Sequence, residues 1–273
     1  MATTMTTYSN IVCRHEEINS VHLQRTVKID YYYPKVLEAG RQIPVLFFND
    51  GQLLEEVEFK RIYDNFLQKN PDSPLLVIGI HAGKERVMEY GTAGVPNYKG
   101  QGAKATAYRL FFMHECLLRS LDKFSFCDRK DVSYAGFSLG GLTAFDTVWA
   151  HPKLFSKVGV FSGSFWWRNR ALDDGYSDEQ NRIIHNIVRD SAPNLNSALR
   201  FYFECGTNDE RADRNHNGII DSIDDTRDLI ELLKQKGYRE PGNIFYDEIP
   251  GGKHNGQTWA ECIPAFLEWG WVK

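Results

Sequence analysis

Short apolar runs alternate with helical patterns along nearly the whole chain, and this alternation limits the possible folds more than any other feature. Several runs are continuously apolar, which is typical of strands covered on both faces in a mostly parallel sheet. Strands and helices in alternation predict an α/β architecture. The predicted strands cover residues 21–33, 45–49, 75–80, 132–137, 157–163, 199–206 and 243–249. The predicted helices lie near residues 55–69, 105–120, 140–150, 178–190, 225–236 and 258–270.

The composition indicates one folded domain without a charged binding face. Of the 273 residues 42% are hydrophobic, and no linker or repeat divides the chain, so a single domain over residues 1–273 is expected. The net charge of −4 argues against nucleic acid and anionic membrane surfaces as partners. No apolar run is long enough to predict a membrane-spanning helix.

The cysteines and the N-terminal residues favour a cytoplasmic location. The five cysteines are an odd number without CxxC spacing, which is more typical of a reducing compartment than of a disulfide framework. The first residues, MATTMTTYSN, do not show the charged and then apolar segments of a secretory signal. The sequence leaves the oligomeric state open.

A G-x-S-x-G pattern marks the candidate nucleophile. Residues 132–141, VSYAGFSLGG, place Gly136, Ser138 and Gly140 between a predicted strand and a predicted helix. This is the setting of a nucleophile elbow, where a serine stands on a strained strand-to-helix turn and glycines let the chain fold tightly around it. We therefore predict Ser138 as the nucleophile; the alternative is a structural glycine-rich turn.

A serine nucleophile needs a base, and the base needs an orienting carboxylate. His254 is the predicted base because it lies in the glycine-rich segment PGGKHNGQTW, between the last predicted strand and the last predicted helix. Asp209 is the predicted acid because it follows the strand at 199–206, and α/β sheets assemble their sites at the carboxyl ends of strands. Glu210 is the second candidate for the acid, and helix capping is the alternative role for Asp209.

Two backbone amides are predicted to stabilise the oxyanion of the tetrahedral intermediate. One belongs to Leu139, directly after the serine, and the other to Gln52 in VLFFNDGQLL, at an early strand-to-loop junction. Aromatic residues after the strand at 157–163 could form the wall of an acyl or leaving-group pocket, with packing in the core as the alternative. These aromatic residues are Phe165, Trp166 and Trp167.

On these residues the chain resembles the putative esterase family of α/β-hydrolases, which includes esterase D, feruloyl esterases and enterochelin esterases. The resemblance implies an α/β-hydrolase fold, with a mostly parallel central sheet and helices on both faces, and a triad of Ser138, Asp209 and His254. The chain departs from the usual GGH of the family because Lys253 precedes the histidine. The resemblance is carried by NDGQLL (49–54), VIGIHAGKERVMEY (77–90), AGFSLGGLTAFDTVWAHPKLFSKVGVFSGSFWW (135–167), CGTNDE (205–210) and GGKHNGQTW (251–259).

The acidic stretch DRNHNGIIDSIDD, residues 213–225, follows the ligand spacing of an EF-hand calcium loop. It most resembles the calcium loop of dockerins, DxNxNGxIDSxD, although its single copy argues against dockerin-like partner binding. The alternative is a solvated turn that caps the following helix through Asp224 or Asp225. The predicted calcium ligands are Asp213, Asn215, Asn217, the backbone carbonyl of Ile219, Asp221 and Asp224.

The sequence therefore predicts a serine carboxylic ester hydrolase that acts through an acyl-enzyme on a small, aryl or siderophore-type ester, without an organic cofactor. An acyltransferase or thioesterase of the same fold is the alternative within the enzymes. A non-catalytic calcium-dependent binding protein is the alternative outside them. The calcium ion is expected to be structural: because Asp213 lies four residues after Asp209, the ion would hold the acid loop against the next helix.

Overall fold

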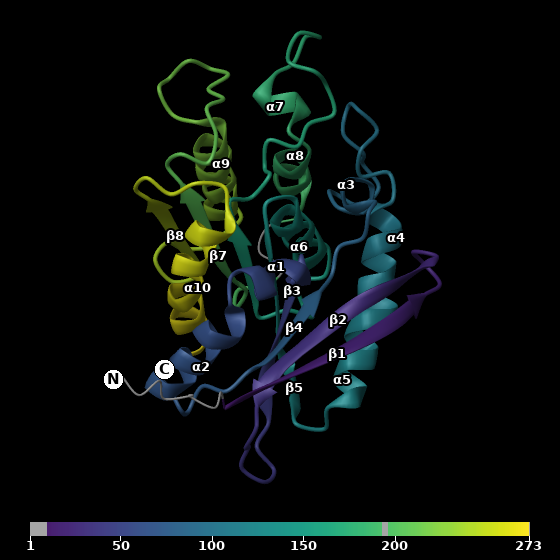
Figure 1. Cartoon of the computed structure of the whole chain (residues 1–273). Helices are drawn as coiled ribbons and strands as arrows, with labels where there is room; N and C mark the ends of the chain where they lie inside the picture. The colour runs from purple at the N-terminus through teal and green to yellow at the C-terminus, as the bar shows by residue number, and fades with distance from the viewer. Residues whose placement is uncertain (1–9, 193–195, 273) are drawn as a thin grey trace, which may run out of the picture.

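The computed structural model describes residues 10–192 and 196–272, whose strands form one eight-stranded sheet in the order β1-β2-β4-β3-β5-β6-β7-β8 (Figure 1). The strands are β1 (Ile11–Ser20), β2 (Arg25–Pro34), β3 (Ile43–Asn49), β4 (Leu76–Ile80), β5 (Cys127–Phe137), β6 (Lys157–Phe161), β7 (Arg200–Gly206) and β8 (Ile244–Ile249). The helices are α1 (Gly51–Glu56), α2 (Phe59–Lys69), α3 (Arg86–Glu89), α4 (Ala105–Leu110), the π-helix η1 (Phe111–Leu117), α5 (Leu118–Lys123), α6 (Leu139–Ala150), α7 (Asp178–Asn181), α8 (Ile183–Asp190), α9 (Asp221–Gln235) and α10 (Gly256–Trp271).

The sheet is parallel apart from its N-terminal edge. β1 pairs antiparallel with β2, and β2 pairs antiparallel with β4. The pairs from β4 through β3, β5, β6 and β7 to β8 are all parallel. The mostly parallel sheet predicted from the sequence is confirmed.

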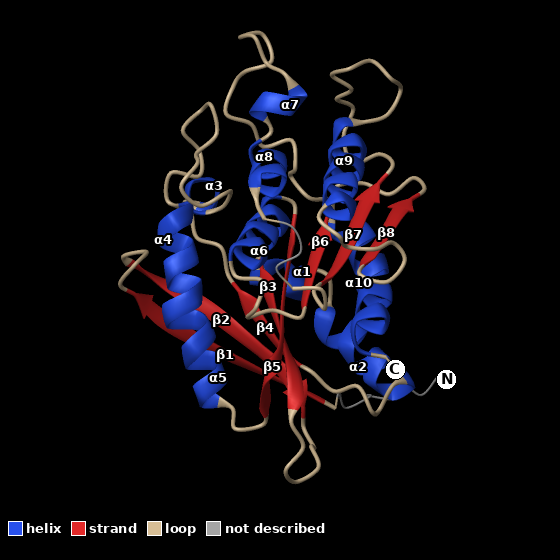
Figure 2. Ribbon diagram, turned by 180° about the vertical axis from the view of Figure 1, so that it is seen from behind, coloured by secondary structure: helices blue, strands red, loops and turns tan. Residues whose placement is uncertain are grey.

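Helices cover both faces of the sheet, and each face has its own apolar core (Figures 1 and 2). Helices α1, α2 and α10 cover one face, where Leu54 and Phe266 are buried. The segment from α4 to α5, together with α6, α8 and α9, covers the other face, where Leu142 and Leu229 are buried. Every residue of β4 and of β6 is buried. Cover on both faces explains why these strands are continuously apolar in the sequence.

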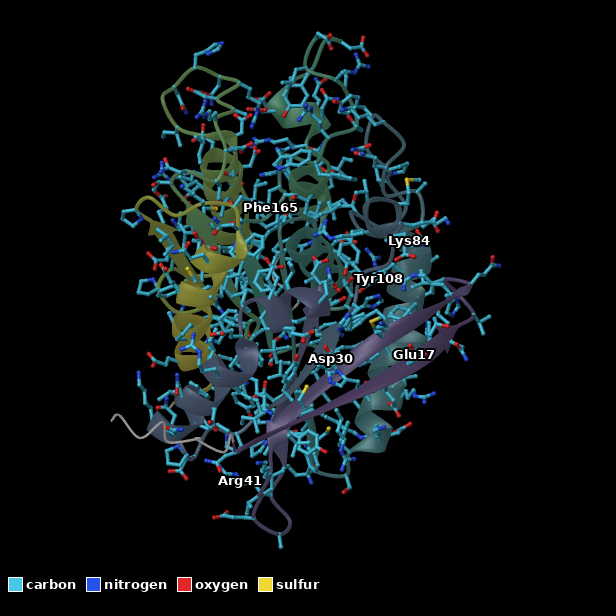
Figure 3. The ribbon with its side chains drawn as sticks, viewed as in Figure 1. Glu17, Asp30, Arg41, Lys84, Tyr108 and Phe165 are labelled. Atoms are coloured by element: carbon cyan, nitrogen blue, oxygen red, sulfur yellow. The ribbon has the colours of Figure 1, made fainter. Side chains whose placement is uncertain are left out.

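The side chains follow this layering. In Figure 3 Tyr108 and Phe165 lie within the body of the molecule, and both are fully buried. Arg41 lies instead near the tip of the loop that joins β2 to β3. Within residues 10–192 and 196–272, no helix combines the length and the apolar character needed to span a membrane.

The prediction of the first strand was wrong in its position. Residues 21–24, which the pattern assigned to a strand, form the turn of a hairpin between β1 and β2. β1 has no predicted counterpart because it is an edge strand in which Glu17 and Arg14 are among the exposed residues. An edge strand of this kind lacks the continuous apolar run that marks the central strands.

The carboxyl ends of the parallel strands bring the predicted site residues to one edge of the sheet. Gln52 follows β3, Ser138 follows β5 and Asp209 follows β7. At the upper edge in Figure 1, the loop that carries α7 and the loop between β7 and α9 rise above the sheet. The two loops lie side by side, since residues of both line a common cavity.

The contact between β6 and α10 generates a stability prediction. A Cβ atom on Gly159 would lie 2.7 Å from the ring of Phe266 and 3.2 Å from the Cβ of Ala135. Gly159→Ala should therefore lower the free energy of unfolding by about 1–3 kcal/mol, as overpacked cores do. Urea denaturation measures this. In Gly270→Ala, the control, the nearest atom is Lys157 Cδ at 3.7 Å, so no loss is expected. Equal stability of the two variants would contradict the close contact.

Candidate active site

Ser138 occupies a strained turn between β5 and α6. Its backbone has φ 54° and ψ −122°, a positive φ that residues other than glycine seldom adopt. The Ser138 N–H donates to the carbonyl oxygen of Phe161 on β6 at 2.8 Å. Strain of this kind persists only where the surrounding structure enforces it, and it is concentrated at functional sites.

Two glycines of the G-x-S-x-G motif permit close backbone contacts. A Cβ on Gly136 would lie 2.5 Å from the carbonyl carbon of Gly140. A Cβ on Gly140 would lie 2.6 Å from the Oδ2 atom of Asp50. The turn thus closes on itself and packs directly against the loop after β3, which larger residues would prevent.

The loop after β7 and the loop after β8 are joined by backbone contacts. The N–H of Thr207 donates to the carbonyl of Ile249 at 3.0 Å, and the N–H of Asn208 donates to the carbonyl of Gly252 at 2.8 Å. The Gly251 N–H donates to the Thr207 hydroxyl at 2.8 Å. These bonds hold the loop that carries Asp209 next to the loop that carries the predicted base.

Asp209 is partly buried beside the Ser162 hydroxyl and His254. Burial raises the pKa of Asp209, whereas the Ser162 hydroxyl and the charge of His254 oppose that rise. Among the residues that the structure describes, neither carboxylate oxygen of Asp209 has a hydrogen-bond partner. Glu210, the second candidate for the acid, contacts the start of α9 instead: its Oε1 atom accepts a hydrogen bond from the Ser222 N–H at 2.7 Å.

His254 lies at the surface of the same region, against Trp259. The two rings meet edge to face, with centroids 5.3 Å apart. Trp259 in turn donates from its Nε1 to the Ser162 Oγ at 2.9 Å. Desolvation by the surrounding protein lowers the pKa of His254, the Asp209 carboxylate raises it, and the charge of Arg86 lowers it.

The structure brings Ser138, Asp209 and His254 to one cavity of about 230 Å³. In the described part of the chain no hydrogen bond joins these three side chains, and the Ser138 Oγ lies 3.3 Å from the Ser164 Oγ instead. Larger depressions of about 610 and 450 Å³ occur elsewhere on the protein, away from the nucleophile. The residues lining the cavity at Ser138 are Ser138, Ser162, Gly163, Ser164, Trp166, Asp209, Glu210, Ser222 and His254.

The two amides predicted for the oxyanion stand at the starts of two helices. Leu139 is the first residue of α6 and Gln52 is the second residue of α1. Amides in the first turn of a helix have no acceptor within that helix, so both are available to an anion. The side chain of Gln52 is fixed at both ends: its Oε1 accepts from the Ala82 N–H at 3.0 Å and its Nε2 donates to Asp50 Oδ1 at 3.1 Å.

A buried ion pair that the sequence analysis did not identify supports this turn. Arg86 donates from Nε and Nη2 to the two carboxylate oxygens of Asp50 at 2.6 and 2.7 Å. Asp50 itself is 0% exposed and has φ 60°. The separation of the two residues in the sequence gives no sign that they pair, although Arg86 lies within a segment that carries the family resemblance.

The aromatic residues predicted to form the pocket wall do not all face the cavity. Trp166 lines the cavity at Ser138. Trp167 is 1% exposed and its ring packs against Gly91 and Gly102, and Phe165 is also fully buried. The proposed pocket role of Trp167 is therefore not supported, because its side chain faces the core.

The 213–224 loop has the side-chain arrangement of a folded Asp/Asn-rich turn. Asp213 accepts hydrogen bonds from the N–H groups of Asn217 and Gly218 at 3.1 and 2.9 Å. Asn215 and Asn217 both donate from Nδ2 to the same oxygen, Oδ2 of Asp224, at 3.0 and 2.7 Å. Four of the six predicted calcium ligands thus face one another around Gly218, whose φ is +86°.

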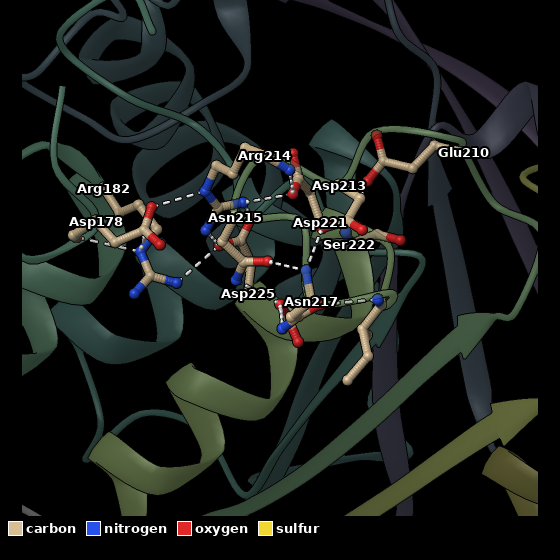
Figure 4. A network of polar contacts seen from close by, with 12 residues as sticks. Asp178, Arg182, Glu210, Asp213, Arg214, Asn215, Asn217, Asp221, Ser222 and Asp225 are labelled. Carbon is tan, nitrogen blue, oxygen red and sulfur yellow. Dashed lines mark hydrogen bonds and ion pairs between the residues drawn. The ribbon is translucent and has the colours of Figure 1, made fainter.

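Arg214 anchors this loop to two neighbouring segments (Figure 4). Its guanidinium pairs with Asp178 at 2.7 Å and with Asp225 at 2.5 Å. Its N–H donates to Oδ1 of Asp221, a predicted calcium ligand, at 2.9 Å. No group of three or more His, Cys, Asp or Glu side chains suited to a metal ion occurs in residues 10–192 and 196–272. The three predicted carboxylate ligands, Asp213, Asp221 and Asp224, are therefore not gathered as a metal site in this structure.

Known proteins are similar to this chain in sequence or in structure. The uncharacterized protein YbbA of Bacillus subtilis (strain 168) is 25% identical over 134 residues, which is 49% of this chain and 46% of YbbA. The enterobactin esterase FES of Shigella flexneri superposes with a TM-score of 0.71 at 19% identity, over 97% of this chain and 60% of FES. A ferulic acid esterase superposes with a TM-score of 0.72 at 15% identity, over 96% of this chain and 98% of its own.

These superpositions confirm the predicted α/β-hydrolase fold. The chain spans about half the length of YbbA and 60% of the Shigella enzyme. The sequence also matches the Putative esterase family over residues 20–269. Because this match covers nearly the entire chain, the protein belongs to the Putative esterase family.

Proposed function

We propose that the protein is a serine hydrolase of carboxylic esters that works through an acyl-enzyme. Ser138 attacks the ester carbonyl, His254 takes the serine proton and passes it to the leaving alcohol, and Asp209 orients His254. Water then releases the acid by the reverse sequence of proton transfers. The observation that carries the proposal is the strained Ser138 at a helix start, inside a cavity that also holds Asp209 and His254.

The oxyanion is stabilised by the amides of Leu139 and Gln52. Both belong to first helical turns, where the partial positive charge of the helix also favours an anion. A hydrogen bond between the end of β3 and α6 supports this assignment: the Asn49 Nδ2 donates to the Gly140 carbonyl at 2.8 Å. The two helix starts are therefore held at a fixed separation before substrate binds, as preorganised stabilisation requires.

The base completes its hydrogen bonds when substrate is bound. His254 is in a loop and is exposed, and catalytic hydrogen bonds are often long in a free enzyme and shorten in the complex. Substrate would displace the contact between the Ser138 and Ser164 hydroxyls, which leaves the serine proton free for the imidazole. The cavity of about 230 Å³ suits a small acyl or leaving group, with Trp166 as its aromatic wall. Enterobactin and ferulic esters are substrates suggested by the structural neighbours.

Loss of the nucleophile tests the proposal. Ser138→Ala should lower kcat for p-nitrophenyl acetate by about 10⁴-fold or more, as removal of a triad serine does. Ser164→Ala removes only the hydroxyl that contacts Ser138, so its effect should stay within about tenfold. Stopped assays at saturating substrate measure both variants. A Ser138→Ala protein that keeps its activity, or a wild-type protein with none on short esters, would refute the esterase and favour a binding protein.

The pH dependence should follow the environment of His254. The base must be neutral to accept a proton, so kcat/KM should fall as pH drops through its pKa, which desolvation of the ring by the surrounding protein places below the ordinary histidine value. Asp209→Asn removes the carboxylate that raises this pKa, so the acid limb should move to lower pH while kcat falls by about 10²–10⁴-fold. Glu210→Gln is the matched control and should leave the midpoint of the limb in place. An unmoved limb in Asp209→Asn would contradict the pairing.

We also propose that the 213–224 loop binds a structural calcium ion. The side-chain ligands would be Asp213, Asn215, Asn217 and Asp224. The side-chain amides of the two asparagines must flip for this, so that their oxygen and nitrogen atoms exchange places. The backbone carbonyl of Ile219 would supply a further oxygen. Asp221 would act through water, because Arg214 occupies one of its oxygens. The proposal is supported by the convergence of the two amides on one Asp224 oxygen.

Calcium should stabilise the fold more than it accelerates the reaction. At a concentration of about 100 Kd, binding contributes about 2.7 kcal/mol, which should raise Tm by roughly 5–10 °C. Asp213→Asn keeps an acceptor for one of the two loop N–H groups that Asp213 binds, but should abolish this shift. Asp228→Asn, an exposed residue paired with Arg182 outside the loop, should retain it. A Tm that does not change between excess calcium and EGTA would refute the ion.

A further inference from the structure

Glu204, on β7, is a buried acid that the proposed mechanism does not use. It is 1% exposed, and neither of its carboxylate oxygens has a hydrogen-bond partner within the described residues. The backbone N–H of Ser162 also acts on the Glu204 carboxyl, but that group already donates to the Glu204 backbone carbonyl at 2.8 Å. A buried carboxylate without a partner would be very costly as an anion.

The neighbours of Glu204 are acidic, weakly acidic or apolar. Tyr202, two residues earlier on the same strand, belongs to the core between the sheet and α10. Strand β8 places Asp247 directly opposite Glu204 in the parallel register. Five titratable groups interact electrostatically with Glu204. They are Asp209 in the loop after β7, Asp247 on β8, Tyr202 and Cys205 on β7, and Cys262 on α10.

These surroundings favour the protonated acid. Burial raises the pKa of Glu204 to about 8, and the negative charges of Asp209 and Asp247 add to the rise. Two carboxyl groups that share a poorly solvated site cannot both ionise cheaply, so the pair keeps one proton. Asp209 is the group that loses its proton first, since His254 and the Ser162 hydroxyl both favour its charged form.

We propose that Glu204 is a positioning residue for the triad: a neutral carboxylic acid near Asp209, so that Asp209 is the charged carboxylate beside His254. The inference rests on the proposed function, because it assigns a regulator to the same site. Asp209 and Glu204 lie on the same face of β7, because Asp209 Oδ1 would lie 2.6 Å from a Cβ atom on Gly206, two residues after Glu204 on the strand. A second charge at Glu204 would repel the Asp209 carboxylate directly and disturb its alignment with the imidazole.

The titration of Glu204 should make the folded state less stable as pH rises. The folded state retains the Glu204 proton up to about pH 8, whereas the unfolded chain releases it near 4.5, the ordinary pKa of glutamate. Between these values the folded state binds more protons, so the free energy of unfolding falls as pH rises through this window and then levels off. Neutral replacements of Glu204 remove this slope and leave the slopes from all other groups.

The test compares wild type with Glu204→Gln, which has the same shape and no charge, and with Glu204→Met, which has no polar group to bury. Asp247→Asn is the control for the loss of a neighbouring but exposed charge. Tm is measured from pH 5 to pH 9.5, kcat/KM on p-nitrophenyl acetate over the same range, and the His254 ring signals by NMR. The comparison uses slopes against pH, so a uniform loss of stability in a variant does not affect it.

We expect the wild-type Tm to fall by roughly 5–10 °C relative to the Glu204 variants between pH 5 and pH 9. Wild-type kcat/KM should decline several-fold above pH 8, while Glu204→Gln and Glu204→Met hold a plateau. In wild type the His254 signals should carry a second inflection near pH 8 that both variants lose. Asp247→Asn should keep the inflection and move it to lower pH, since it removes a charge that raises the pKa of Glu204.

Two outcomes would overturn the inference. If the variants keep the wild-type Tm slope, Glu204 is not a buried neutral acid. If the Tm slope disappears but the alkaline limb and the His254 inflection stay, Glu204 does not act on the triad. A failure of the proposed function is distinct, because the Tm and NMR measurements need no turnover, whereas activity that survives in Ser138→Ala would refute only the esterase mechanism.

Discussion

The candidate site depends on one buried amide, the side chain of Asn49 at the end of β3. Its Nδ2 donates to the Gly140 carbonyl, and its Oδ1 accepts from the hydroxyls of Tyr108 and Tyr134 at 2.6 Å each. The two segments that Asn49 joins carry the two amides proposed to bind the oxyanion, since Gln52 follows in α1 and Leu139 opens α6. Loss of this amide would leave two tyrosine hydroxyls buried without their acceptor, which is more costly than the loss of a surface hydrogen bond.

Buried charge is handled in two ways around this edge of the sheet. Asp50 is paired with Arg86, and Asp225 is paired with both Arg182 and Arg214. In each pair the arginine comes from a different segment than the aspartate. The pairing therefore fixes one segment to another, at the cost of desolvating both charged groups. Glu204 has no such partner among the described residues. Neutralisation by a proton is the remaining way to bury it, so its burial depends on pH.

Local patterns predicted the fold well, and the strand-turn-helix context of Ser138 with it, because their signals are short-range. The continuous apolar strands, the helix after Ser138 and the glycines around it are all properties of neighbouring residues. The first predicted strand, residues 21–33, was misplaced, and β1 was not predicted because it has no continuous apolar run. Asn49 and the pair of Asp50 with Arg86 could not be predicted, since their partners come from distant segments that only the folded sheet brings together. The aromatic wall was half wrong for a related reason: Trp166 and Trp167 are adjacent, and the sequence does not show which of them faces the core.

The acid loop is held independently at its two ends, and this limits what a calcium ion could do. At the Asp209 end, backbone bonds from Thr207 and Asn208 to the loop after β8 set its position. At the far end, Arg214 and the bond from Glu210 to the Ser222 N–H attach the 213–224 loop to α9. These contacts exist between protein groups alone, so removal of an ion leaves Asp209 anchored through its own end of the loop. In the proposed mechanism, the charge state of Glu204 near Asp209 therefore acts more directly on the alignment of Asp209 with His254 than a metal ion in the adjoining loop would.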